Sequence, residues 1–142
     1  DEYIAKYFEE NIFTHLGAMH CACKSKGVDM AICSFAYPSL NWYEFIPRLY
    51  LDFNMKKVWA WHIKDVPLIT FRTYTKIIDI YNRELKKFCE REGIIYIPVA
   101  EEFKAGLEHF FDVCHTTPLG LDVKTDIIGS YVARWIKNKG FR

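Results

Sequence analysis

Apolar residues recur every three or four positions in three long segments of this chain, which is the spacing of an amphipathic helix. The first segment covers residues 1–26 and the second covers residues 73–92. The third begins near Asp122, a residue suited to an N-cap, and ends at Gly140. We therefore predict three long helices. Their apolar positions are, in chain order, Ile4, Phe8, Ile12, Leu16, Met19 and Cys23; Tyr74, Ile77, Ile78, Tyr81, Leu85 and Phe88; and Val123, Ile127, Ile128, Tyr131, Val132, Trp135 and Ile136.

Two short, mostly apolar runs lie between these helices, as expected for strands buried on both faces of a parallel sheet. They cover residues 28–35 and 94–99, and Pro98 weakens the second run because it cannot donate a hydrogen bond. Residues 58–63 form a third candidate strand or part of a helix. The alternation of helices and strands predicts one α/β domain over residues 1–142, with a parallel sheet covered by helices.

Residues 41–70 are rich in aromatic side chains, and a connection of this length is typical of an insertion or a lid. Ligands of open α/β sheets bind beyond the carboxyl ends of the strands, so Tyr37, Trp42 and Tyr43 are candidates for lining a substrate pocket. Core packing is the alternative for these three residues. His62 has the same two interpretations, as a substrate-lining residue or as part of a half-buried aromatic cluster.

The charge and the cysteine content exclude several classes of protein. A formal net charge of +1 gives no electrostatic basis for binding nucleic acid or an anionic membrane. No apolar run approaches the roughly 20 residues that a membrane span needs. The five cysteines are odd in number and scattered, which argues against a disulfide framework and favours a reducing compartment such as the cytoplasm.

A cluster of metal-ligand residue types lies in the first predicted helix, at His15, His20, Cys21 and Cys23. Zinc sites place four ligands around one point, usually with Cys pairs in a loop. Helical spacing directs these side chains to different sides, so we expect packing and solvent exposure here. No metal or organic cofactor is predicted.

The segment FFDVCHTTPLG, residues 110–120, carries the strongest candidate chemistry. It places Asp112 three residues before His115, just ahead of the last predicted helix. In acyl transfer a histidine takes a proton from a serine hydroxyl and returns it to the leaving group, while a carboxylate orients the imidazole. The alternative is a surface loop in which Asp112 caps a local turn. Cys114 is adjacent to His115, and neighbouring side chains in an extended loop point apart, so we do not expect a Cys114–His115 dyad.

Three passages together resemble the SGNH (GDSL-type) hydrolases. GVDMAICSFAYP is similar to that family's penultimate core strand, and YNRELKKFCEREGIIYIPV is similar to its passage of Tyr-Asn, helix, Gly and strand. The Asp-x-x-His of residues 112–115, followed by a Gly and a C-terminal helix, resembles its last block. The resemblance covers nearly the whole chain except residues 41–70.

This resemblance implies a flavodoxin-like, three-layer fold of about five parallel strands with helices on both faces. It also implies a serine esterase or acetylhydrolase with His115 as the general base and Asp112 as its orienting acid. The substrate would be a small acyl ester or an acetylated carbohydrate. The family's Gly-Asp-Ser and Gly-x-Asn-Asp motifs are absent from this sequence. We therefore expect this chain to be the C-terminal part of such an enzyme, inactive without an N-terminal fragment that carries the nucleophile.

Two other functions stay open at this point. The chain could be a non-catalytic binding module or a degenerate hydrolase that docks a partner or a glycan and closes its sheet as a homo-oligomer. It could also be a different hydrolase that uses Ser34, Ser39 or Cys114 as its nucleophile.

Overall fold

The computed structural model describes residues 1–38, 71–104, 106–111 and 114–140. The predicted insertion at 41–70 and the candidate strand at 58–63 lie outside these ranges. The elements of the described residues are α1 (Glu2–Phe8), a π-helical segment (Glu9–Phe13), α2 (Thr14–Ser25), β1 (Ala31–Cys33), α5 (Phe71–Glu92), β2 (Ile95–Ile97), α6 (Val99–Glu102), a 3₁₀ turn (Leu107–His109) and α7 (Pro118–Asn138).

The prediction of a flavodoxin-like, three-layer α/β fold is wrong. Helices predominate, and the described residues contain two strands of three residues each, β1 and β2, which pair in parallel. The apolar runs at 28–35 and 94–99 are longer than the strands within them. Pro98 follows β2 and has no N–H to extend the ladder. Beyond β1, the backbone of Phe35 bonds to the Asn82 side chain instead of to another strand.

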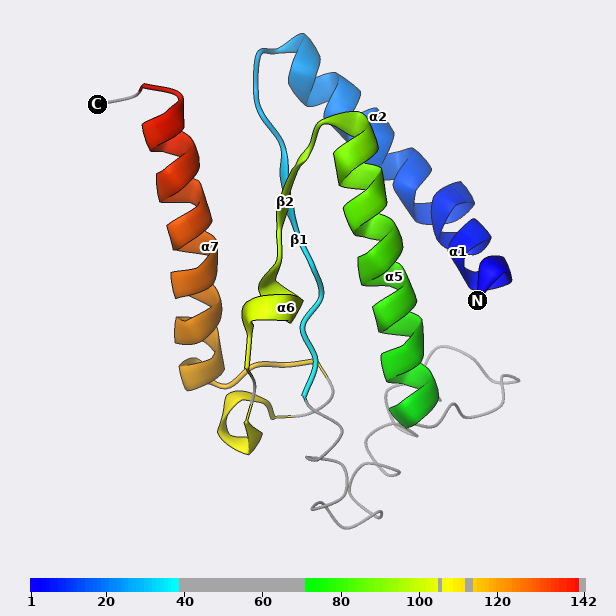
Figure 1. Cartoon of the computed structure of the whole chain (residues 1–142), viewed down its shortest axis with the longest axis vertical. Helices are drawn as coiled ribbons and strands as arrows, with labels where there is room; N and C mark the ends of the chain where they lie inside the picture. The colour runs from blue at the N-terminus through cyan, green and yellow to red at the C-terminus, as the bar shows by residue number, and fades with distance from the viewer. Residues whose placement is uncertain (39–70, 105, 112–113, 141–142) are drawn as a thin grey trace.

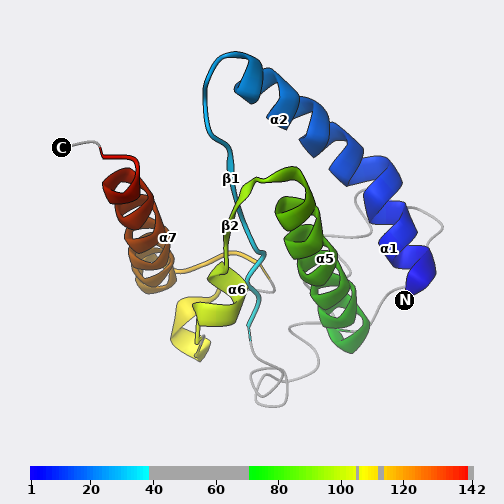
Figure 2. The ribbon, with the colours of Figure 1, turned by 45° about the horizontal axis from the view of Figure 1, so that its top comes forward.

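The helices lie on both sides of this small sheet, as Figures 1 and 2 show. Helices α1, α2 and α5 lie on one side, and α7 lies on the other. Each side has its own apolar cluster. The first cluster consists of Phe8, Phe13, Ile80, Leu85, Phe88, Cys89 and Ile94. The second consists of Ala36, Ile97, Val99, Phe103 and Phe110, with Val123, Ile127, Ile128 and Tyr131 of α7 packed against it.

The predicted helix over residues 1–26 is confirmed, but it contains a π-helical segment at Glu9–Phe13. A π-helical turn takes up more residues than an α-helical turn, so it rotates the residues that follow around the helix axis. Phe13 therefore enters the core, with 1% of its surface exposed, whereas the predicted core residue Met19 is 56% exposed.

The predicted ends of the first two long helices are also confirmed. Gly27 and Gly93 follow them with φ angles of 67° and 72°, a conformation that glycine adopts without steric cost. The predicted start of the last helix near Asp122 is wrong. Helix α7 begins four residues earlier at Pro118, and the Thr117 side chain is its N-cap, accepting a hydrogen bond from the Gly120 N–H at 3.2 Å. A proline at the first helical position lacks only an N–H that has no partner inside the helix.

The buried thiol of Cys89 gives a testable consequence of this packing. Its exposed fraction is 0%, and burial raises the pKa of the Cys89 thiol to about 11. Because the thiolate is the reactive form, we expect iodoacetamide at pH 8 to leave Cys89 unmodified while it alkylates the exposed Cys21. Peptide mass mapping measures both sites, and the same reaction in denaturant is the control, in which both cysteines react. Equal labelling of the two in the folded protein would contradict this packing.

Candidate functional site

The carboxyl ends of β1 and β2 lie at the same end of the molecule, because the two strands are parallel. The chain leaves β1 through residues 34–37 and leaves β2 into α6. The 3₁₀ turn and the first turn of α7 lie at this end as well, as Figure 1 shows. Ligands of parallel sheets bind beyond this end of the strands.

Asn82 of α5 fixes the exit of β1. Its Oδ1 accepts a hydrogen bond from the Phe35 N–H at 2.7 Å, and its Nδ2 donates to the Phe35 carbonyl at 2.9 Å. Asn82 is buried, so the backbone groups that it bonds would lose their partners if its amide were removed. This side chain replaces the strand ladder at the point where β1 ends.

We expect Asn82→Ala to lower the free energy of unfolding by roughly 1–3 kcal/mol, because both hydrogen bonds to Phe35 are lost. Asn11→Ala is the matched control, since the exposed Asn11 amide makes one local bond to the Tyr7 carbonyl. Urea denaturation of both variants measures the difference. An equal loss of unfolding free energy in the two variants would show that the bonds from Asn82 to Phe35 do not stabilise the fold.

Ser34 and Glu101 form a second connection between the strand exits. The Ser34 hydroxyl donates to Glu101 Oε2 at 2.7 Å and accepts from the Ala100 N–H at 2.8 Å. The Tyr96 hydroxyl donates to Glu101 Oε1 at 2.6 Å, and burial together with this bond raises the pKa of Tyr96. Ser34 is 2% exposed and its proton points at a carboxylate. Its geometry is that of a structural serine, not of a nucleophile beside an imidazole.

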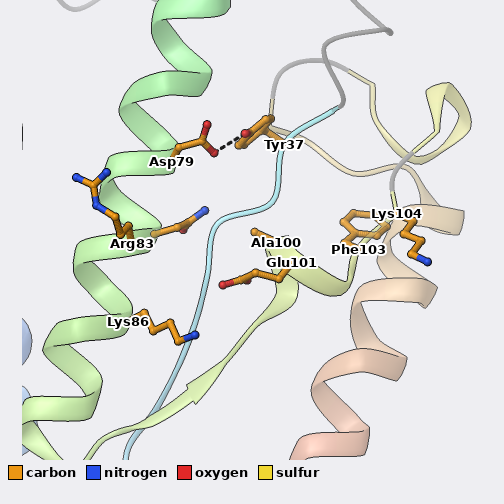
Figure 3. A pocket seen from close by; sticks show the side chains of 9 residues that line it. Tyr37, Asp79, Arg83, Lys86, Ala100, Glu101, Phe103 and Lys104 are labelled. Atoms are coloured by element: carbon orange, nitrogen blue, oxygen red, sulfur yellow. Dashed lines mark hydrogen bonds between the residues drawn. The ribbon is translucent and has the colours of Figure 1, made fainter. Parts of the chain in front are cut away.

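A pocket of about 670 Å³ opens between α5 and α6, next to these connections (Figure 3). Tyr37 donates a hydrogen bond to Asp79 Oδ1 at 2.5 Å across its upper part. Burial, and then this bond and the negative charge of Asp79, raise the pKa of Tyr37, so its hydroxyl keeps its proton at neutral pH. The lining residues are Tyr37, Asp79, Asn82, Arg83, Lys86, Ala100, Glu101, Phe103 and Lys104.

The loop that carries His115 is held at both ends. Phe110 and Thr116 form an antiparallel bridge, and the Phe111 N–H donates to the His115 carbonyl at 2.8 Å. Thr117 then docks the loop on α7, because its N–H donates to the His109 carbonyl at 3.0 Å. The imidazole of His115 is exposed. The chain therefore presents this side chain from a fixed loop at a helix N-terminus.

The expectation that Cys114 and His115 point apart is wrong. Cys114 Sγ lies 3.5 Å from His115 Nδ1, within hydrogen-bond distance for sulfur. The expectation assumed an extended loop, whereas Cys114 lies at a bend, two residues before the Thr116 that bridges to Phe110.

Tyr37 lines the pocket between α5 and α6, and its predicted contact with a substrate stays a prediction. Asp112, Trp42, Tyr43 and His62 lie outside the described residues, so their predicted roles stay predictions.

Sequence reasoning missed the residues of α5 and α6 that line the pocket. One signal was present in the sequence, because Asn82 lies on α5 close to Leu85 of the first cluster and to Tyr81, which packs against that cluster. A polar residue on such a face commonly has a buried hydrogen-bonding role. No such signal marked the charged lining residues of α5, because charged residues on a helix are most often solvated. These residues are Asp79, Arg83 and Lys86.

Within the described ranges, no three His, Cys, Asp or Glu side chains lie close enough together to hold a metal ion. His15, His20, Cys21 and Cys23 all lie on α2. None of the described helices is long and apolar enough to cross a membrane. Comparisons of the chain with protein-family models, with curated proteins and with solved structures gave no match.

Proposed function

We propose that this chain supplies the general base, His115, to an acyl-ester hydrolase with a serine nucleophile. The observation that supports the proposal most is the presentation of His115. Its imidazole is exposed on a loop that is bridged at Phe110 and Thr116, beyond the carboxyl ends of the strands. A base that must reach a substrate needs both an accessible ring and a fixed backbone.

In the proposed reaction, His115 removes the proton from the serine hydroxyl as the oxygen attacks the ester carbonyl, and it then protonates the departing alcohol. Asp112 would stabilise the imidazolium. The serine and the oxyanion donors would come from polypeptide outside these 142 residues. Small acyl esters and acetylated carbohydrates are the proposed substrates.

The test is hydrolysis of p-nitrophenyl acetate by the naturally occurring protein and its His115→Gln variant. We expect kcat/KM to fall by about 10²–10⁴, because a positioned general base contributes that factor. His15→Gln is the matched control, since His15 is an exposed histidine on α2. Thermal unfolding should be unchanged in both variants. Equal activity of His115→Gln and the unmodified protein would rule the proposal out.

The contact between Cys114 and His115 favours a second candidate, a hydrolase that uses the Cys114 thiolate as its nucleophile. Cys114→Ala separates the two candidates. It abolishes turnover if the thiolate attacks the ester and leaves turnover in place if a serine does. Trapping with a serine-directed phosphonate, followed by peptide mapping, identifies the attacking residue. If neither residue is labelled and no ester is cleaved, the non-catalytic binding module replaces both.

A further inference from the structure

In the pocket between α5 and α6, the hydrogen-bond acceptors are largely occupied, whereas several donors have no acceptor among the described residues. Glu101 uses both carboxylate oxygens, which accept from the hydroxyls of Ser34 and Tyr96. Asp79 accepts from the Tyr37 hydroxyl. The protein's own hydroxyl groups therefore already engage the two acidic groups of the pocket.

The cationic side chains of the same pocket make few ion pairs or hydrogen bonds with the residues that the structure describes. Within the described part of the chain, no carboxylate pairs with Lys86 or Lys104. Arg83 contacts Glu84 through Nε at 2.8 Å, and Figure 3 shows its guanidinium turned away from the α6 side of the pocket. Asn82 bonds to the Phe35 carbonyl through Nδ2, which carries a second N–H.

We propose that this pocket binds a small organic anion and holds its carboxylate or phosphate oxygens through Lys86 and the spare N–H of Asn82. Asn82 and Lys86 lie four positions apart on α5, one helical turn, so both side chains are on the face that lines the pocket. An acceptor-rich anion supplies what the pocket lacks, and oxygens of this kind form strong charge-assisted hydrogen bonds with Lys.

The opposite wall indicates that the ligand also has an apolar part. Ala100 and the buried Phe103 line that wall, on the α6 side of the pocket, as Figure 3 shows. The volume of about 670 Å³ lies within the range of pockets that bind small molecules, roughly 300–1,000 Å³. An aromatic or short aliphatic acid or phosphate ester therefore fits both walls, whereas a free inorganic ion would use only one. This inference concerns a site that the proposed ester hydrolysis does not assign.

The test is calorimetric titration of the naturally occurring protein, at constant ionic strength, with phenyl phosphate, benzoate, inorganic phosphate and benzyl alcohol. We expect phenyl phosphate or benzoate to bind, and the tighter of these two identifies the oxyanion. Inorganic phosphate should bind more weakly, and benzyl alcohol should not bind. Constant ionic strength is needed because salt screens exposed charges.

Lys86→Gln should weaken the tighter-binding anion about tenfold, the effect of losing one charge-assisted hydrogen bond. Lys87→Gln is the matched control, because it removes the same charge from the next position of α5 but does not line the pocket. Shifts of the Asn82 side-chain amide signals in ¹⁵N spectra should accompany binding. Equal loss in both variants, or tighter binding of benzyl alcohol, overturns the proposal. His115→Gln should leave anion affinity unchanged, so failure of this inference is distinguishable from failure of the proposed hydrolysis.

Discussion

Replacing Gly120 by alanine is expected to lower the free energy of unfolding by about 3 kcal/mol, the upper end of the usual cost of overpacking. Gly120 is buried in the first turn of α7. A Cβ atom at this position would lie 2.1 Å from the His109 carbonyl oxygen and 3.0 Å from its carbon. The same oxygen accepts a hydrogen bond from the Thr117 N–H. The 3₁₀ turn that carries His109 therefore cannot move away from α7 without losing that bond.

Gly129→Ala is the matched control for this prediction. Gly129 lies on the same helix, and a Cβ atom there would have nothing within 4 Å. Alanine at an exposed helical position should stabilise the protein by up to about 1 kcal/mol. Denaturant unfolding of both variants measures the two values. A neutral Gly120→Ala variant would mean that the His115 loop is not docked against α7 as described.

The second large effect is expected at Phe13, where substitution by alanine should cost about 3–5 kcal/mol. The Phe13 ring stacks on Phe88 with their centroids 5.2 Å apart and their planes at 17°. It also contacts the rings of Tyr81 and Phe8, at 5.8 Å and 6.4 Å. Removal of this buried ring leaves a cavity between the first helix and α5, whose walls lose their contacts.

Ile12→Ala is the comparison that tests the π-helical segment itself. A regular α-helix with the predicted apolar positions places Ile12 in the core, whereas the structure leaves Ile12 partly exposed beside the buried cluster. We therefore expect Ile12→Ala to cost about half as much as Phe13→Ala, or less, because the cost scales with the buried surface removed. Thermal and urea unfolding give both values. A larger cost at Ile12 would show that the helix keeps the α-helical register.

The sequence by itself determined the features that depend on nearby residues. The period of apolar positions predicted the long helices, because such a helix is stable only when one of its faces is covered. Gly27 and Gly93 predicted helix ends, because each supplies a positive φ angle. The segment at 110–120 predicted a presented His115, and the described structure places it on a loop just before α7. Its catalytic role stays a prediction.

Only the tertiary structure decided the features that depend on contacts between distant segments. The apolar runs at 28–35 and 94–99 were compatible with long strands, yet they pair over three residues, because Asn82, 47 positions from Phe35, bonds to the backbone beyond β1. Phe13 is buried in the core and the predicted core residue Met19 is exposed, because the π-helical segment changes which side of the helix faces α5. The pocket likewise combines residues from α5, α6 and the exit of β1, and no local pattern in the sequence brings these together.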